Sequence, residues 1–304
     1  MRYLHLDVFA DRPFEGNQLA VFPEPGGLST ATMQEIAREM NFSESTFIFP
    51  AQSGGNAGRA KMRIFTPGTE LPMAGHPTIG STYALAAEGT IPQGQTDFIF
   101  ELGVGPLPVS LEWIGGRLDF VWMTQILPAF GPEIRDHAAF AAAVGLDTRD
   151  LMAALPIEEI SCGVPYLFVP LMSRDAVDRV TLDRRAYACC LDAEGLPERP
   201  CFFFTTAAAV SGGDDETVYS RMLAPGFGIT EDPATGSACG PLGCYLVHHE
   251  LVDSGAAQRI VNRQGVAMGR SSRIHICIDA DDGAISRVRI GGRAIMVGHG
   301  ELDV

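Results

Sequence analysis

The sequence predicts an α+β protein of two similar halves, in each of which antiparallel β-strands surround a buried helix. Three observations support this prediction. Short runs of alternating apolar and polar residues dominate the chain, two helical segments are small or apolar on nearly every side, and the loop before each of them is repeated. The length of 304 residues exceeds that of most single hydrophobic cores, so two domains are expected.

Strand-like runs fill the first half of the chain. Their apolar residues alternate with polar ones, which is typical of strands with one buried face. Gly115 and Gly116 separate the last two runs, and two glycines suit a two-residue hairpin that needs positive backbone angles. The runs are YLHLDVF, NQLAVF, STFIF, AKMRIF, DFIFEL, LPVSLEWI and RLDFVWM. We therefore expect the first half to be antiparallel and rich in β-structure.

Two helices interrupt these strands. The first is expected from about Ser29, which suits an N-cap, through Met40. The second is expected over residues 77–88 and is ended by Gly89. Its sequence, PTIGSTYALAAE, has no polar face, which indicates burial on every side. A sheet is therefore expected to wrap around the second helix.

The pattern starts again after residues 125–132, QILPAFGP, which we interpret as a linker. Strand-like runs and a helix over about 183–192 then precede a second buried helix that begins near Ser237. At an offset of 161, E-x-P-x-x-G-H-P at 70–77 aligns with E-x-P-x-x-G-S-A at 231–238. Because the flanking elements match as well, duplication explains the repeat better than chance does.

Each repeated loop leads into a helix N-terminus, where unpaired N–H groups and a partial positive charge favour an anion. Gly75 and Gly236 allow a ligand to approach the backbone, and Pro77 suits the first helical turn. Taken singly, each loop is better explained as a tight turn. Taken together at one cleft, the two loops predict a receptor for a small carboxylic acid.

The composition argues against several classes of function. A net charge of −15 and a pI near 4.8 disfavour nucleic acid and anionic membrane surfaces as partners, since both attract concentrated positive charge. We expect a cytoplasmic protein, because no apolar run reaches roughly 20 residues and the N-terminus is too charged for a secretory signal. The seven scattered cysteines match neither a disulfide framework nor a zinc motif, so no metal site is expected.

Three ionisable residues lie in or near these loops. His76 stands in the first loop, Asp232 precedes Pro233 in the second, and Glu44 lies between serines where a helix gives way to an apolar strand. Each has an ordinary interpretation when taken alone: a hydrogen-bonding histidine, a turn residue and a solvated charge. Together with two anion-binding loops they indicate an acid–base site.

These motifs together resemble the phenazine-biosynthesis PhzF-like family, which has the diaminopimelate epimerase fold. The resemblance is carried by DVFADRPFEGNQLAVF, NFSESTFIF, RIFTPGTELPMAGHPTIGSTYAL, EDPATGSACGPLGCYL and GGRAIMVGHGEL. It implies two pseudo-symmetric domains, each a mostly antiparallel β-sheet curled around a central α-helix, with the active site between them. It also implies a homodimer. The expected domains are residues 1–127, completed by a strand at about 292–304, and residues 128–291.

The resemblance implies roles for individual residues. Glu44 matches the catalytic glutamate of the family, His76 the histidine of its AGHP motif and Asp232 the aspartate of EDPxTGSA. Gln18 departs from the usual proline of a GNP segment, which concerns the local shape of that loop. The positions expected to hold the substrate carboxylate are Gly75 with His76, and Gly236 with Ser237.

The epimerase branch of this fold uses two cysteines as acid and base, and Ala74 stands where the first would be. A two-cysteine epimerase is therefore not expected, and Cys239 is interpreted as a small buried residue. The expected reaction is a proton transfer by Glu44 on a small carboxylic acid without a cofactor, an isomerisation. The alternatives are a lyase or hydratase acting on a small hydroxy acid, and a non-catalytic protein that binds small acids.

Overall fold

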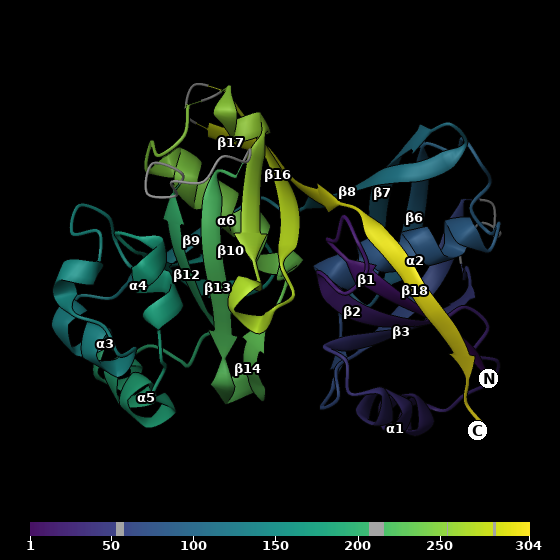
Figure 1. Ribbon diagram of the computed structural model, residues 1–304, viewed down its shortest axis with the longest axis horizontal. Helices are drawn as coiled ribbons and strands as arrows, with labels where there is room; N and C mark the ends of the chain where they lie inside the picture. Colours follow the sequence, from purple (N-terminus) through teal and green to yellow (C-terminus); the bar gives the residue numbers. More distant parts are fainter. Residues whose placement is uncertain (53–57, 207–215, 254, 282–283) are drawn as a thin grey trace. The chain divides into compact units, whose positions relative to one another are not determined.

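The computed structural model describes residues 1–304 except 53–57, 207–215, 254 and 282–283 (Figure 1). The chain divides into two compact units. Unit 1 comprises Met1–Thr124 with Arg289–Val304, and unit 2 comprises Gln125–Val288. Each unit is an α+β structure with a mostly antiparallel sheet, in agreement with the sequence. The expected domain boundaries near residues 127 and 291 stay predictions.

Unit 1 contains a sheet in which the N-terminal and C-terminal strands of the chain are neighbours. Its strands are β1 (Arg2–Val8), β2 (Asn17–Phe22), β3 (Glu44–Pro50), β4 (Arg59–Phe65), β5 (Glu70–Leu71), β6 (Asp97–Leu102), β7 (Gly105–Ile114), β8 (Arg117–Gln125) and β18 (Ala294–Glu301). They pair in the order β18–β1–β2–β3–β4–β6–β7–β8, with β5 also on β4, and only β2–β3 and β4–β6 among these pairs are parallel. Gly115 and Gly116 have positive φ angles and form the predicted hairpin between β7 and β8.

The central helix of unit 1 is α2 (Gly75–Ala87), which packs against β1, β2, β3 and β18 (Figure 1). Ten of its thirteen residues are buried, so it presents no polar face to solvent, as its composition predicts. Small residues on α2 allow the helix to pack closely against these strands. At Gly80 an added Cβ would lie within 2.6 Å of side-chain carbons of both Val8 and Leu19. A larger residue at this position would therefore force the helix away from the strands.

The helix α1 (Thr30–Met40) packs on β3 and β4. Ser29 is its N-cap, as the sequence predicts, and its hydroxyl accepts a hydrogen bond from Thr32 N at 3.1 Å. Met33, Ile36 and Ala37 form the buried stripe and pack with aromatic residues of β2, β3 and β4. Helix α1 thus covers unit 1 with one apolar face, whereas α2 is enclosed.

Unit 2 contains a sheet of the same topology. Its strands are β9 (Ala129–Glu133), β10 (Glu158–Ser161), β11 (Pro165–Pro170), β12 (Cys201–Thr206), β13 (Val218–Ala224), β14 (Ile229–Asp232), β15 (Ile260–Gln264), β16 (Ser272–Asp281) and β17 (Ala284–Gly292), the last of which continues into unit 1. They pair in the order β9–β10–β11–β12–β13–β15–β16, with β14 also on β13. The parallel pairs, β11–β12 and β13–β15, stand where β2–β3 and β4–β6 stand in unit 1.

The interpretation of residues 125–132 as a linker is wrong for residues 129–132. Half of this segment, residues 129–132, belongs to β9, which pairs with β10 in an antiparallel ladder. All five residues of β9 are exposed. Its sequence therefore lacks the alternation of apolar and polar residues that marks a half-buried strand. Its proline and glycine also suggest a loop. The backbone pairing, rather than burial, makes this segment a strand.

The α-helices that the structure describes in unit 2 comprise one enclosed helix and three that cover the sheet. They are α3 (His137–Ala143), α4 (Arg174–Arg179), α5 (Arg184–Ala193) and α6 (Gly236–His248), with short turns η1 (Thr148–Asp150), η3 (Pro225–Phe227), η4 (Ala256–Gln258) and η5 (Val266–Met268). Helix α6 packs against β10, β11 and β16 and has ten buried residues, like α2. It begins 161 residues after α2 and has the same length, which agrees with duplication. None of the helices in the described part of the chain is long and apolar enough to cross a bilayer.

Candidate active site

Glu44 and His76 lie side by side in unit 1. Side chains alternate along β3, so Glu44 and Thr46 point to the same face of the strand, toward α2. Thr46 Oγ1 lies 2.9 Å from Ser81 Oγ in the middle of α2. Two residues earlier on the strand, Glu44 Oε2 lies 3.3 Å from His76 Nε2 in the first turn of the helix. The structure thus brings these two predicted residues together, with side-chain exposures of 13% and 5%.

His76 carries a neutral imidazole at neutral pH. Burial lowers its pKa to about 3, and a hydrogen bond with the Gln18 backbone opposes this shift without cancelling it. Nδ1 of the ring lies 3.4 Å from the side-chain amide nitrogen of Asn17. Nε2 is near Glu44 but is aligned for a hydrogen bond with none of the residues that the structure describes. The Glu44–His76 contact is therefore one between a carboxyl group and an uncharged ring, and not an ion pair.

The two central helices begin differently from the other α-helices that the structure describes. In α1, α3, α4 and α5 a side chain of the N-cap accepts a hydrogen bond from the first turn; these caps are Ser29, Asp136, Ser173 and Asp183. The N-caps of α2 and α6 are Ala74 and Thr235, and within the described residues neither makes such a bond. The N–H groups at Gly75 and Gly236 therefore receive no capping side chain, which suits a site for an anion.

Asp232 is held in place by Thr235 and Gln264 in unit 2. Thr235 Oγ1 donates a hydrogen bond to Asp232 Oδ2 at 2.6 Å. The Gln264 side-chain nitrogen, on β15, donates to the Asp232 carbonyl oxygen at 2.7 Å and to Thr235 Oγ1 at 2.9 Å. Gln264 Oε1 accepts from Thr235 N at 3.2 Å. Because all three residues are buried, this network fixes the carboxylate in one position.

Ser237 is the one position from Asp232 to Leu246 that is not fully buried. Its Oγ lies 2.7 Å from the hydroxyl of Tyr166 on β11. The preceding Gly236 is buried, and its carbonyl oxygen accepts a hydrogen bond from the Gln125 side chain at 3.0 Å. Both predicted binding residues of the second loop therefore stand in the first turn of α6, with the serine hydroxyl at the accessible point.

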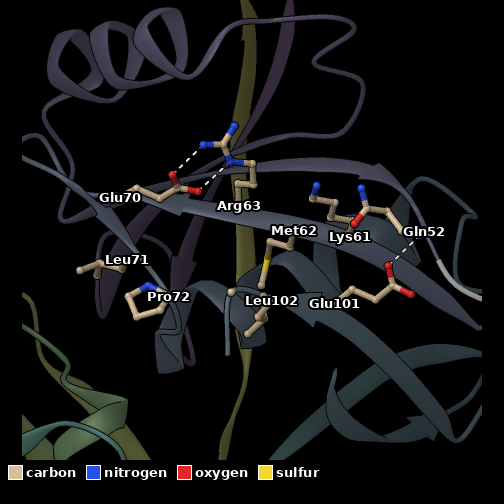
Figure 2. Close-up of a pocket in the computed structure, with 10 residues that line it drawn as sticks. Gln52, Lys61, Met62, Arg63, Glu70, Leu71, Pro72, Glu101 and Leu102 are labelled. Carbon is tan, nitrogen blue, oxygen red and sulfur yellow. Dashed lines mark hydrogen bonds and ion pairs between the residues drawn. The ribbon is translucent and has the colours of Figure 1, made fainter. Parts of the chain in front are cut away.

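An arginine–glutamate pair ties each repeated loop to its sheet. In unit 1, Arg63 on β4 donates to Glu70 through Nε and Nη2 at 2.7 and 2.6 Å (Figure 2). In unit 2, Arg221 on β13 donates to Glu231 in the same way at 3.0 and 2.8 Å. Arg221 Nη1 also donates to three backbone carbonyl oxygens at the end of α4. The glutamate of the repeated motif is therefore a structural residue that anchors the loop.

A surface hollow of about 570 Å³ lies beside the first loop (Figure 2). Its lining includes Lys61, Arg63, Glu70 and Glu101, and Arg63 is already occupied by Glu70. None of the six predicted site residues lines this hollow. This hollow is therefore not the predicted site, whose residues belong to the mouth of α2 in unit 1 and to the mouth of α6 in unit 2.

Comparison with known proteins identifies the family. A family model described as phenazine biosynthesis-like protein matches residues 6–300. The chain belongs to this family. It is 36% identical over 299 residues to a trans-2,3-dihydro-3-hydroxyanthranilate isomerase from Pseudomonas aeruginosa, with 98% of each chain covered. As a relative of this and other curated isomerases, the PhzF-like chain is an isomerase.

Solved structures agree with this assignment. A PhzF-family protein from Bacillus anthracis has a TM-score of 0.86 and 25% identity, covering 100% of this chain and 99% of its own. A protein from Pseudomonas aeruginosa described as a predicted epimerase has a TM-score of 0.79 and 32% identity, covering 99% and 98%. A probable proline racemase from Agrobacterium radiobacter, at 14% identity and a TM-score of 0.65, shares the fold alone. The PhzF-like chain therefore has the epimerase-type fold that the sequence predicts.

Cys239 is a small buried residue, as predicted, and offers no epimerase thiol. It lies inside α6 and is fully buried. Burial raises the pKa of its thiol, and a hydrogen bond from Asn262 opposes this shift. At the mouth of α2 the PhzF-like chain has Ala74, which carries no thiol. Among the described residues of these loops, the ionisable groups are thus carboxyl and imidazole groups and not an accessible thiol.

Three residues that complete the site are not predicted from the sequence. Asn17 contacts His76, Gln264 holds Asp232, and Tyr166 contacts Ser237 by its hydroxyl, and each lies at a strand end far along the chain from its partner. One signal is present in the sequence: a polar residue at an inward position of an apolar strand. Such a polar residue does not reveal which helix the strand faces. The order of the strands in the sheet is also needed to predict its partner.

Proposed function

We propose that this isomerase transfers a proton on a small carboxylic acid without a cofactor, with Glu44 as the general acid and base. Glu44 removes a proton from one carbon of the substrate and returns it to another. The observation that carries the proposal is the position of Glu44 Oε2, largely buried and 3.3 Å from a neutral imidazole at the mouth of α2. A largely buried carboxylate can exchange a proton directly with a bound ligand. A solvent-exposed carboxylate is stabilised as the anion by water and is therefore a weaker base.

The uncapped helix mouths supply the proposed site for the substrate carboxylate. Gly75 and Gly236 present backbone N–H groups, and the Ser237 hydroxyl adds a further donor. Such fixed donors also stabilise the negative charge that develops when a carbon-bound proton leaves. That both loops serve one substrate stays a prediction from the sequence.

His76 and Asp232 have auxiliary roles in this proposal. The neutral ring of His76, with Nε2 3.3 Å from Glu44 Oε2, can pass a proton to or from Glu44 without adding a buried charge. Asp232, fixed by Thr235 and Gln264, offers an acceptor for polar hydrogens of the ligand, such as those of an amine or hydroxyl group. The substrate in this proposal carries such a group near its carboxylate.

The first candidate substrate comes from the relative in Pseudomonas aeruginosa, whose name states that it isomerises trans-2,3-dihydro-3-hydroxyanthranilate. This compound is a small acid with an amine and a hydroxyl group, which fits the donor and acceptor set described above. We propose it as the test compound, along with other unsaturated hydroxy acids of similar size.

Incubation of this acid with the enzyme in D2O, followed by mass spectrometry, tests the proposed function. We expect an isomeric product that has gained deuterium at carbon, because the proton on Glu44 exchanges with solvent during turnover. A product lighter by one water would support the lyase or hydratase instead. Binding without any carbon-bound exchange would support the non-catalytic alternative. Either result contradicts the proposal.

A further inference from the structure

The hydroxyl of Tyr166 lies within hydrogen-bond distance of the Ser237 hydroxyl. Tyr166 lies on β11 with its side chain toward α6, and it is buried with 6% of its surface exposed. Its hydroxyl is 2.7 Å from Ser237 Oγ, and its ring packs beside Phe168 in the core of unit 2. A buried tyrosine hydroxyl usually finds a partner, and here one partner is the accessible serine at the helix mouth.

The direction of this hydrogen bond decides what Ser237 offers to a ligand. Each hydroxyl has one proton, and each oxygen can also accept. The phenol is the more acidic of the two, so the favoured arrangement has Tyr166 donate to Ser237 Oγ. The proton of Ser237 is then directed elsewhere, and the serine is the less buried partner at the mouth of α6. A serine fixed in this way is a donor aimed at an anion.

We propose that Tyr166 is a positioning residue that orients the Ser237 hydroxyl to donate a hydrogen bond to the carboxylate of the substrate. This inference rests on the proposed role of Ser237 as a carboxylate ligand, and it adds a residue outside the loop motifs. Tyr166 acts through Ser237 and needs no contact with the reacting carbon. Its contribution is therefore expected in the binding of the acid.

A double-mutant cycle tests this coupling. The binding of anthranilate, a ring carboxylate related to the proposed substrate, is measured by calorimetry for the wild type, Tyr166→Phe, Ser237→Ala and the double variant. We expect Tyr166→Phe to weaken binding about 3- to 10-fold, the value of one net hydrogen bond. In the Ser237→Ala background the same change is expected to alter affinity less than about twofold, because its target is gone.

Tyr245→Phe is the matched control. Tyr245 is also a buried tyrosine, and its hydroxyl donates to the Pro156 carbonyl oxygen at the same distance of 2.7 Å, but away from the first turn of α6. It is expected to lose stability as Tyr166→Phe does and to keep its affinity for anthranilate. Equal affinity losses in the two tyrosine variants would show a general packing effect and overturn the proposal.

Two further outcomes would also overturn this role. One is an undiminished effect of Tyr166→Phe when Ser237 is alanine. The other is equal binding of anthranilate and its neutral amide, 2-aminobenzamide, by the wild type, since no carboxylate would then be recognised. These measurements need no turnover, so failure of the proton-transfer proposal in D2O remains a separate result.

Discussion

The loops before α2 and α6 share a scaffold but not their chemistry. Each is anchored by a bidentate arginine–glutamate pair, and each leads into an enclosed thirteen-residue helix whose N-cap side chain makes no capping bond in the described part of the chain. The first loop then offers His76, in contact with Glu44. The second offers Asp232 and Ser237, held by neutral hydrogen-bonding partners. The two loops thus share a frame, whereas the side chains at the two mouths differ.

The anchors themselves differ in burial. The side chains of Arg63 and Glu70 are 21% and 37% exposed, whereas those of Arg221 and Glu231 are 10% and 13% exposed. Arg221 also donates to three carbonyl oxygens at the end of α4, whereas Arg63 donates to Glu70 and to the Thr30 hydroxyl. The same contact is therefore expected to matter far more in unit 2, since a buried charge that loses its partner is costly.

Replacing the two arginines gives the largest expected difference between the loops. Arg221→Met leaves a largely buried carboxylate and three carbonyl groups without their donor, so we expect a loss of about 3–5 kcal/mol in the free energy of unfolding. Arg63→Met removes a more exposed pair and is expected to cost at most about 1 kcal/mol. Chemical denaturation of both variants measures the contrast, and equal losses would contradict it.

The acid sensitivity of the first loop is expected to depend on His76. Its pKa is about 3 in the folded protein and near 6.5 in an unfolded chain, so the unfolded state binds the extra proton. The contribution of this group to stability is therefore present above pH 6.5 and is lost progressively as the pH falls toward 3. His76→Gln should show a smaller fall in unfolding free energy than the wild type across this window. Parallel pH profiles of the two proteins would refute the buried neutral ring.

The network of the second loop is tested by Gln264→Leu. Leucine has a similar size but leaves Thr235 N and the Asp232 carbonyl without the amide, so we expect a loss of about 1–3 kcal/mol in stability and a lower rate. Asn262→Leu is the control, because Asn262 is an equally buried amide on β15 that contacts Cys239 instead. It should lose comparable stability and retain more activity per folded molecule. Equal rates for the two variants would show that Gln264 has no special effect on Asp232.

Local patterns in the sequence predict much of this fold. Ser29 caps α1, two glycines form the β7–β8 hairpin, and the enclosed helices follow from segments without a polar face. β9 escapes detection because all its residues are exposed and its pairing depends on a distant strand. Short-range periodicity reports burial, and it says little about a strand defined by backbone bonds alone.

The candidate site also contains residues that the sequence predicts and residues that only the structure reveals. The residues in the repeated motifs, such as His76 and Asp232, are visible in the sequence because the motif itself marks the helix mouth. Tyr166 is 71 positions from Ser237, and its role follows only when β11 is placed against α6. The arginine partners of the motif glutamates are likewise fixed by strand pairing and not by spacing. The partners of the motif residues are therefore known only from the tertiary structure.

Glu44→Gln tests the central claim most directly. The substitution keeps the shape of the side chain and removes the proton acceptor, so the isomerisation of trans-2,3-dihydro-3-hydroxyanthranilate and its deuterium uptake in D2O should fall by about 10²- to 10⁴-fold while anthranilate still binds. Glu39→Gln, an exposed carboxylate on α1, is the control and should retain the wild-type rate. Near-normal deuterium uptake by Glu44→Gln would contradict the assignment of Glu44 as the acid–base group.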